Sequence, residues 1–285
     1  MPHRLQKCLL FSFVVLVAGC NSHQATEQQG EKDTLSQNIS SPAGQADTTH
    51  LKYNHLISNI PVPFEILNKL SNLHLAYAPG LINPLRSLSN YNKRESKSLN
   101  LGVYGADLTY IISLGEFKEF APHVKAIKHL ADELDIPLAF DDEMMSRYNI
   151  NPPNKDTLQN ALFNSYHEID RSLKANDRLG MAALVVCGGW VESLYLTTRT
   201  IGQNENSGKY ADLYLLVQAQ RKHLQNLIGL LSDFKTEPFQ NIVISLKETE
   251  ELYEATGEGK LLKNEDLKKI SEELAKLRAM IVTEN

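Results

Sequence analysis

The chain has 285 residues, 42% of them hydrophobic, and its 29 Lys and Arg against 34 Asp and Glu give a formal net charge of −5. This length allows one large or two small domains with a sizeable core. The mildly acidic balance excludes the basic surface that nucleic-acid binding requires, so we expect no nucleic-acid partner.

The N-terminal residues, MPHRLQKCLLFSFVVLVAGCNSHQ, have the layout of an export signal. Arg4 and Lys7 precede an apolar run at 9–17, and Ala18 and Gly19 are small residues of the kind that a signal peptidase requires. The run is too short to span a bilayer. The sequence therefore predicts a signal peptide at 1–19.

The segment LVAGC at 16–20 resembles the lipobox of bacterial lipoproteins. This resemblance implies cleavage before Cys20, acylation of its thiol and amine with chains such as palmitate, and membrane attachment through several acyl chains. In that family an Asp after the cysteine commonly retains the protein at the inner membrane. Asn21 therefore implies the outer membrane, with a domain that faces the periplasm. An ordinary secretory signal with a cysteine at this position is the alternative.

Residues 21–49 contain no aromatic and few aliphatic side chains, so this stretch cannot bury enough surface to order itself. We expect the lipidated Cys20 and a flexible linker at 20–50, followed by a single domain at 51–285. Because Cys8 leaves with the signal and Cys20 carries lipid, Cys187 has no disulfide partner.

The remainder of the chain is predicted to be helical, because apolar residues recur at spacings of three and four. The stripes are Phe64, Leu67, Leu70, Leu73 and Tyr77; Leu158, Leu162, Tyr166, Ile169 and Leu173; Tyr210, Leu213, Val217, Leu224, Leu227 and Leu231; Phe239, Ile242, Val243, Leu246 and Tyr253; and Leu267, Ile270, Leu274, Leu277 and Ile281. Polar stretches at 90–98 and 149–155 predict loops. Pro238 suits the first turn of a helix, and Asn264 is placed to cap the last one.

No alternation of period two is sustained, so strands are not expected. We predict an all-α fold, an antiparallel helical bundle of about eight to ten helices with a disordered N-terminal tether.

The chain lacks the rigidly spaced motifs of covalent haem, zinc, di-iron, P-loop and dinucleotide sites. The closest histidine pairs, five and six residues apart, do not share a helix face. Asp141, Asp142 and Glu143 form the densest acid cluster, which either binds a hard cation or caps a helix start. We favour the cap and expect no metal, no cofactor and no assigned catalytic residue.

Residues 179–191 form an apolar run with several glycines and alanines, which suits a central core helix. The segment 101–110 also contains Gly102, Gly105 and Ala106, so the two segments are natural partners for a tight crossing. Cys187 lies in the first of these segments. Its apolar flanks favour a buried structural thiol over a nucleophile.

Two acids interrupt these apolar helices. Asp107 lies between two tyrosines, and Glu192 lies near the single tryptophan and another tyrosine. A buried acid needs a partner or a raised pKa. One interpretation is a ligand pocket lined by Tyr104, Asp107, Tyr110, Trp190, Glu192 and Tyr195. The other is surface exposure or a buried ion pair with Arg178, Arg199 or Arg171.

The segments SLNLGVYGADLTYIISLGE and ALVVCGGWVESLYLTT resemble stretches in a family of helical lipoproteins from Bacteroidetes-type bacteria. The resemblance covers residues 50–285 and implies a helical fold and an envelope location. It implies no activity, substrate or catalytic residue.

The sequence therefore predicts a lipid-anchored envelope protein that acts by binding a partner protein or a small ligand. The alternative is an envelope enzyme that uses the acid pair Asp107 and Glu192 in a pocket between helices.

Overall fold

The computed structural model describes residues 51–56, 63–73, 75–138, 154–176, 178–202, 210–257 and 260–283. All of them belong to one compact unit, residues 42–285. The predicted signal peptide, lipidated cysteine and tether lie outside the described residues, and so do Asp141, Asp142 and Glu143.

The described residues form helices and connecting loops without a strand, which confirms the all-α prediction. The elements are α2 (Pro63–Leu67), η1 (Asn68–Leu73), η2 (Leu85–Asn90), α3 (Arg94–Leu114), η3 (Phe117–Glu119), α4 (Phe120–Glu133), α6 (Lys155–Ala175), α7 (Leu179–Gly202), α8 (Ala211–Leu231), α9 (Glu237–Ala255) and α10 (Asn264–Val282), where η marks a short 3-10 helix. Residues 51–56 are also helical.

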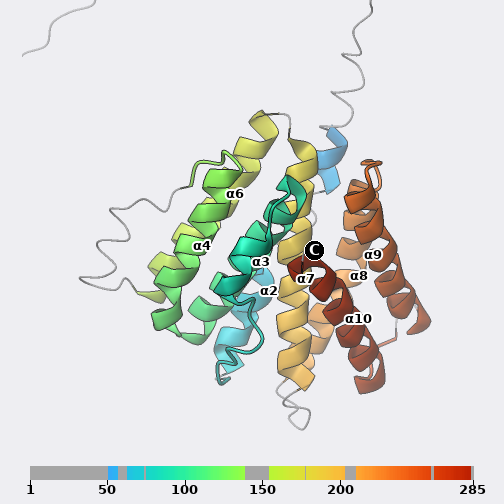
Figure 1. Cartoon of the computed structure of the whole chain (residues 1–285). Coiled ribbons are helices and arrows are strands. Elements are labelled where there is room, and N and C mark those ends of the chain that lie inside the picture. Colours follow the sequence, from blue (N-terminus) through green and yellow to red (C-terminus); the bar gives the residue numbers. More distant parts are fainter. Residues whose placement is uncertain are drawn as a thin grey trace, which may run out of the picture. The chain divides into compact units, whose positions relative to one another are not determined.

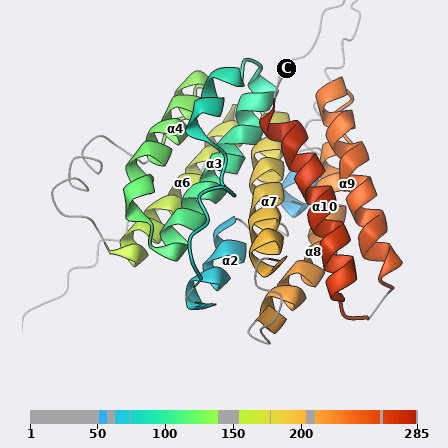
Figure 2. The same cartoon turned by 60° about the horizontal axis from the view of Figure 1, so that its bottom comes forward.

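Helix α7 is the centre of the bundle (Figures 1 and 2). It packs against α2, α3, α6, α8 and α10, with α4 and α6 on one side of the domain and α8, α9 and α10 on the other. Among the described helices, α7 alone is long and apolar enough to cross a membrane, but 78% of its most apolar window is buried inside the domain. It is therefore the core helix that its composition predicts.

The predicted crossing between the two glycine-rich segments is the tightest contact of the bundle. A Cβ atom on Gly188 of α7 would lie 1.9 Å from the carbonyl oxygen of Leu99 in α3, and one on Gly102 would lie 2.0 Å from that of Val185. No side chain fits at either position, so the two backbones touch directly. Interior glycines cost about 1 kcal/mol each relative to alanine, and this packing offsets that cost.

Four of the predicted stripes lie on buried helix faces, in α6, α8, α9 and α10. Pro238 is in the first turn of α9, as expected, and Gly257 follows that helix in a left-handed conformation with φ of +81°.

Three local predictions are wrong. The first stripe changes to 3-10 geometry at Asn68 and ends at Leu73, so Tyr77 lies in an irregular segment. The predicted loop at 90–98 ends early, because α3 begins at Arg94. The N-cap of α10 is Lys263, whose backbone N–H donates to the Asp266 carboxylate, while Asn264 accepts a hydrogen bond from Tyr214.

Substituting Gly188 with Ala tests the backbone contact. We expect Gly188→Ala to lower the free energy of unfolding by at least about 3 kcal/mol, because its methyl group would displace the α3 backbone. The control is Gly202→Ala at the end of α7, where a Cβ meets no atom within 4 Å. It should change stability by less than about 1 kcal/mol. Urea unfolding measures both, and equal losses in the two variants would contradict the proposed crossing.

Candidate functional site

The α3–α7 crossing brings the two predicted acids together. Asp107 of α3 and Glu192 of α7 both have 0% exposed surface, and the charge of Glu192 acts on the carboxyl group of Asp107. The two acids therefore lie together in an interior without exposed surface.

The positive charge beside these two acids is Arg278 of α10. Arg278 Nε donates to Glu192 Oε2 over 2.6 Å, and its Nη2 donates to the Leu81 carbonyl over 3.1 Å. Burial lowers the pKa of Arg278, but the charge and the hydrogen bond of Glu192, together with Asp107 and Tyr195, outweigh burial, so the guanidinium stays protonated. Arginines 171, 178 and 199 were the expected partners, and none of them fills this role.

Two carboxyl groups face one guanidinium, so the charges do not balance if both acids are ionised. Asp107 Oδ2 accepts from the Asn83 N–H over 3.0 Å, whereas Asp107 Oδ1 and Glu192 Oε1 are buried without a hydrogen-bond partner. Burial raises the pKa of Asp107 well above its ordinary value, and the charge of Glu192 raises it further. Burial also raises the pKa of Glu192, and Arg278 opposes this. Asp107 is therefore the acid that stays protonated, and Glu192, beside Arg278, is the acid that is ionised.

The four aromatic candidates from the predicted pocket each have a different partner. Tyr104 donates to the Pro84 carbonyl, and Tyr110 accepts from the Ala78 N–H. Trp190 donates from Nε1 to Gln220 on α8 over 3.1 Å. Of the four aromatic candidates, Tyr195 is the one whose ring lies against Arg278, 4.4 Å from the guanidinium carbon.

Cys187 is buried in α7, and burial raises the pKa of its thiol to about 12. A thiol with such a pKa carries almost no thiolate at neutral pH. The structural interpretation of Cys187 is confirmed. Within the described ranges, no group of three or more His, Cys, Asp or Glu side chains could hold a metal ion.

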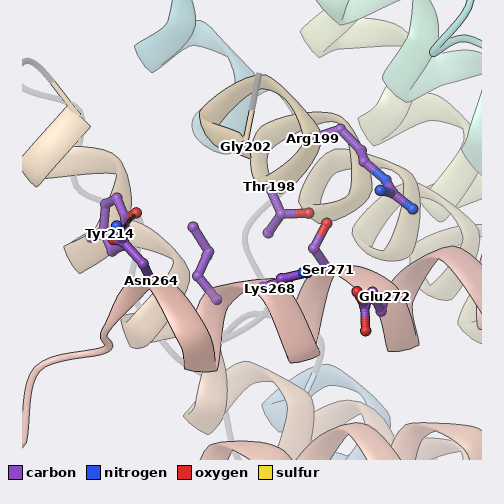
Figure 3. Close-up of a pocket in the computed structure, with 9 residues that line it drawn as sticks. Thr198, Arg199, Gly202, Tyr214, Asn264, Lys268, Ser271 and Glu272 are labelled. Carbon is purple, nitrogen blue, oxygen red and sulfur yellow. Dashed lines mark hydrogen bonds between the residues drawn. The ribbon is translucent and has the colours of Figure 1, made fainter. Parts of the chain in front are cut away.

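An open polar pocket lies elsewhere, between the C-terminal end of α7 and helices α8 and α10. Its volume is about 300 Å³, and it is lined by Thr198, Arg199, Gly202, Tyr214, Asn264, Leu267, Lys268, Ser271 and Glu272. Figure 3 shows Thr198 and Arg199 on the α7 wall, the α10 residues on the opposite wall, and Tyr214 with Asn264 at one end. None of the six residues predicted for a pocket lines it.

The charged side chains of this pocket have no counter-charge among the residues that the structure describes. Arg199, Lys268 and Glu272 form no ion pair with any described residue. Arg199 Nε is also buried without a hydrogen-bond acceptor. The pocket can therefore bind a polar ligand, whereas the acid cluster already has its counter-charge.

Sequence reasoning missed this pocket and Arg278. A signal for Arg278 was available, because it lies four residues after Leu274 and three before Ile281, beside the buried stripe of α10. The pocket has no such signal, since its lining residues come from three helices that are far apart in the sequence.

Comparison with protein-family models, with curated proteins and with solved structures found no match to this chain.

Removing one acid at a time tests where the proton lies. Asp107→Asn keeps a neutral donor toward Glu192 and should leave the fold intact. Glu192→Gln leaves the buried Arg278 charge without its partner and should cost about 3–5 kcal/mol. Chemical unfolding at neutral pH measures both, and a larger loss in Asp107→Asn would show that the charged acid had been assigned to the wrong residue.

The raised Asp107 pKa also gives stability a pH dependence. The native state keeps a proton that the unfolded chain releases above its ordinary Asp pKa of about 3.9. The free energy of unfolding should therefore fall as pH rises from that value toward the native pKa, by up to about 1.4 kcal/mol per pH unit. Asp107→Asn should reduce this slope and become the more stable protein at neutral pH. An unchanged slope would contradict the prediction.

Proposed function

We propose that this protein is a lipid-anchored component of the bacterial cell envelope whose helical domain binds a small ligand in the pocket between α7, α8 and α10. The observation that carries the binding function is Arg199, which lines a cavity of about 300 Å³ and whose buried Nε has no hydrogen-bond partner. Pockets of this size bind small molecules in many proteins.

The envelope location rests on the export signal and on the resemblance of LVAGC to a lipobox, with Cys20 as the acylated residue. Asn21 after the lipobox cysteine supports a location at the outer membrane, with the domain facing the periplasm. The resemblance to helical lipoproteins of Bacteroidetes-type bacteria supports the same location.

Binding is better supported than catalysis by the acid pair. A general acid or base must reach the substrate within hydrogen-bond distance, directly or through one water. Asp107 and Glu192 have no exposed surface, and they form no part of the pocket wall. Their hydrogen bonds to Asn83 and Arg278 account for them as structural groups.

Cys20→Ser tests the anchor, and Cys8→Ser is its matched control. In a bacterium that processes lipoproteins, the wild type and Cys8→Ser should fractionate with the outer membrane, and mass spectrometry should find acyl chains on an N-terminal Cys20. Cys20→Ser should lack this modification and leave the outer-membrane fraction. Membrane association that survives Cys20→Ser, without any acylated peptide, would rule out the lipid anchor.

Gly202→Leu tests the pocket, because this glycine lines the cavity and a Cβ on it meets no atom within 4 Å. Gly80→Leu is the control, since its Cβ also meets no atom within 4 Å and it lies outside the pocket. Ligand-observed NMR with a set of small polar fragments should find fragments that bind the wild type and Gly80→Leu but not Gly202→Leu. If no fragment shows this dependence on Gly202, the ligand-binding function fails.

A further inference from the structure

We propose that the pocket between α7, α8 and α10 binds the anionic group of a small molecule, a carboxylate or a phosphate, between Arg199 and Lys268. The inference rests on the proposed ligand-binding function and adds the chemical class of the ligand. The two cations come from opposite walls, Arg199 from α7 and Lys268 from α10 (Figure 3).

The first support is the missing acceptor at Arg199. This residue is partly buried, and its Nε has no hydrogen-bond partner. A buried donor without an acceptor costs free energy, and the cost is higher for a charged group. Guanidinium groups present several N–H donors in a planar fork that matches a carboxylate or a phosphate. An oxyanion in the pocket would supply the acceptor that the protein does not.

The second support is the charge balance around Tyr195. The guanidinium carbons of Arg278 and Arg199 lie 4.4 Å and 5.5 Å from the centre of this one ring. Arg278 is neutralised by Glu192, whereas Arg199 has no carboxylate partner among the described residues. A bound anion would give the second guanidinium the counter-charge that the first already has.

The other lining residues limit the ligand. Ser271 lies on the α10 wall and offers a hydroxyl donor to an oxyanion. Glu272, on the same wall, would repel a second negative group. Tyr214 and Asn264 are hydrogen-bonded to each other over 2.6 Å, so this pair adds no charge at its end of the pocket. The lining therefore favours a small ligand with one anionic group over a polyanion.

The test uses the full-length mature protein and three probes: inorganic phosphate, butyrate, and butyramide as the neutral analogue of butyrate. The concentration dependence of the melting temperature at constant ionic strength gives the affinities. We expect phosphate or butyrate to bind and butyramide not to bind, and the anion that binds identifies the ligand as a phosphate or a carboxylate compound. Binding should weaken as salt is raised.

Two neighbouring lysines provide a matched pair of variants. Lys268 lines the pocket and Lys269 does not, while both are exposed on α10. Lys268→Gln should weaken anion binding by about tenfold or more, Lys269→Gln should leave it unchanged, and Lys268→Arg should retain it.

Several outcomes would overturn the anion site. Equal losses in Lys268→Gln and Lys269→Gln would mean that the anion binds the general surface. Binding of butyramide as strong as that of butyrate, abolished by Gly202→Leu, would leave the pocket function standing and refute its anion preference. Absence of binding by both anions would also refute it, and the fragment experiment would then decide separately whether the pocket binds any ligand.

Discussion

The contact between the backbones of α3 and α7 is the constraint on which the rest of the structure depends. Gly102 and Gly188 have no side chain at the crossing, so each helix lies directly against a carbonyl oxygen of the other. Asp107 follows Gly102 by five residues and Glu192 follows Gly188 by four, so both acids are little more than one turn from the contact. The crossing therefore carries both carboxyl groups into an interior without exposed surface. Helices separated by larger side chains would leave room for water between these acids.

Closing that interior requires α10. Arg278 neutralises Glu192 and Asp107 keeps a proton, so the buried cluster has no net charge. Nearer the start of α3, Asn100 donates to the Ile281 carbonyl and holds the C-terminal end of α10 against the core. With this end of α10 held in the core, the earlier part of the same helix forms one wall of the pocket. Arg278 thus stabilises the domain. Lys268, about 15 Å earlier on the same helix, serves the proposed function by lining the pocket.

Much of the fold could be predicted from the sequence because its cause is local. Apolar stripes predicted α6, α8, α9 and α10, and small residues predicted the α3–α7 crossing. Predicted helix boundaries were wrong where tertiary packing overrides local sequence preference. At Arg94, for example, a polar stretch that predicts a loop continues into a buried helix. The partner of Glu192 could not be predicted, because Arg278 is 86 residues away and the apparent candidates were nearer in sequence. The pocket was unpredictable for the same reason, since no single segment contains a pattern for it.

Infrared spectroscopy of the carboxyl groups at neutral pH tests the central claim, that the two acids are a closed structural pair with one shared proton. The account predicts a carbonyl stretching band of a protonated carboxylic acid in the wild type at neutral pH, and its loss in Asp107→Asn. If the wild type lacks this band, both acids are ionised, and water or a second cation must reach them. That result would contradict the closed interior and return the acid pair to consideration as a catalytic site.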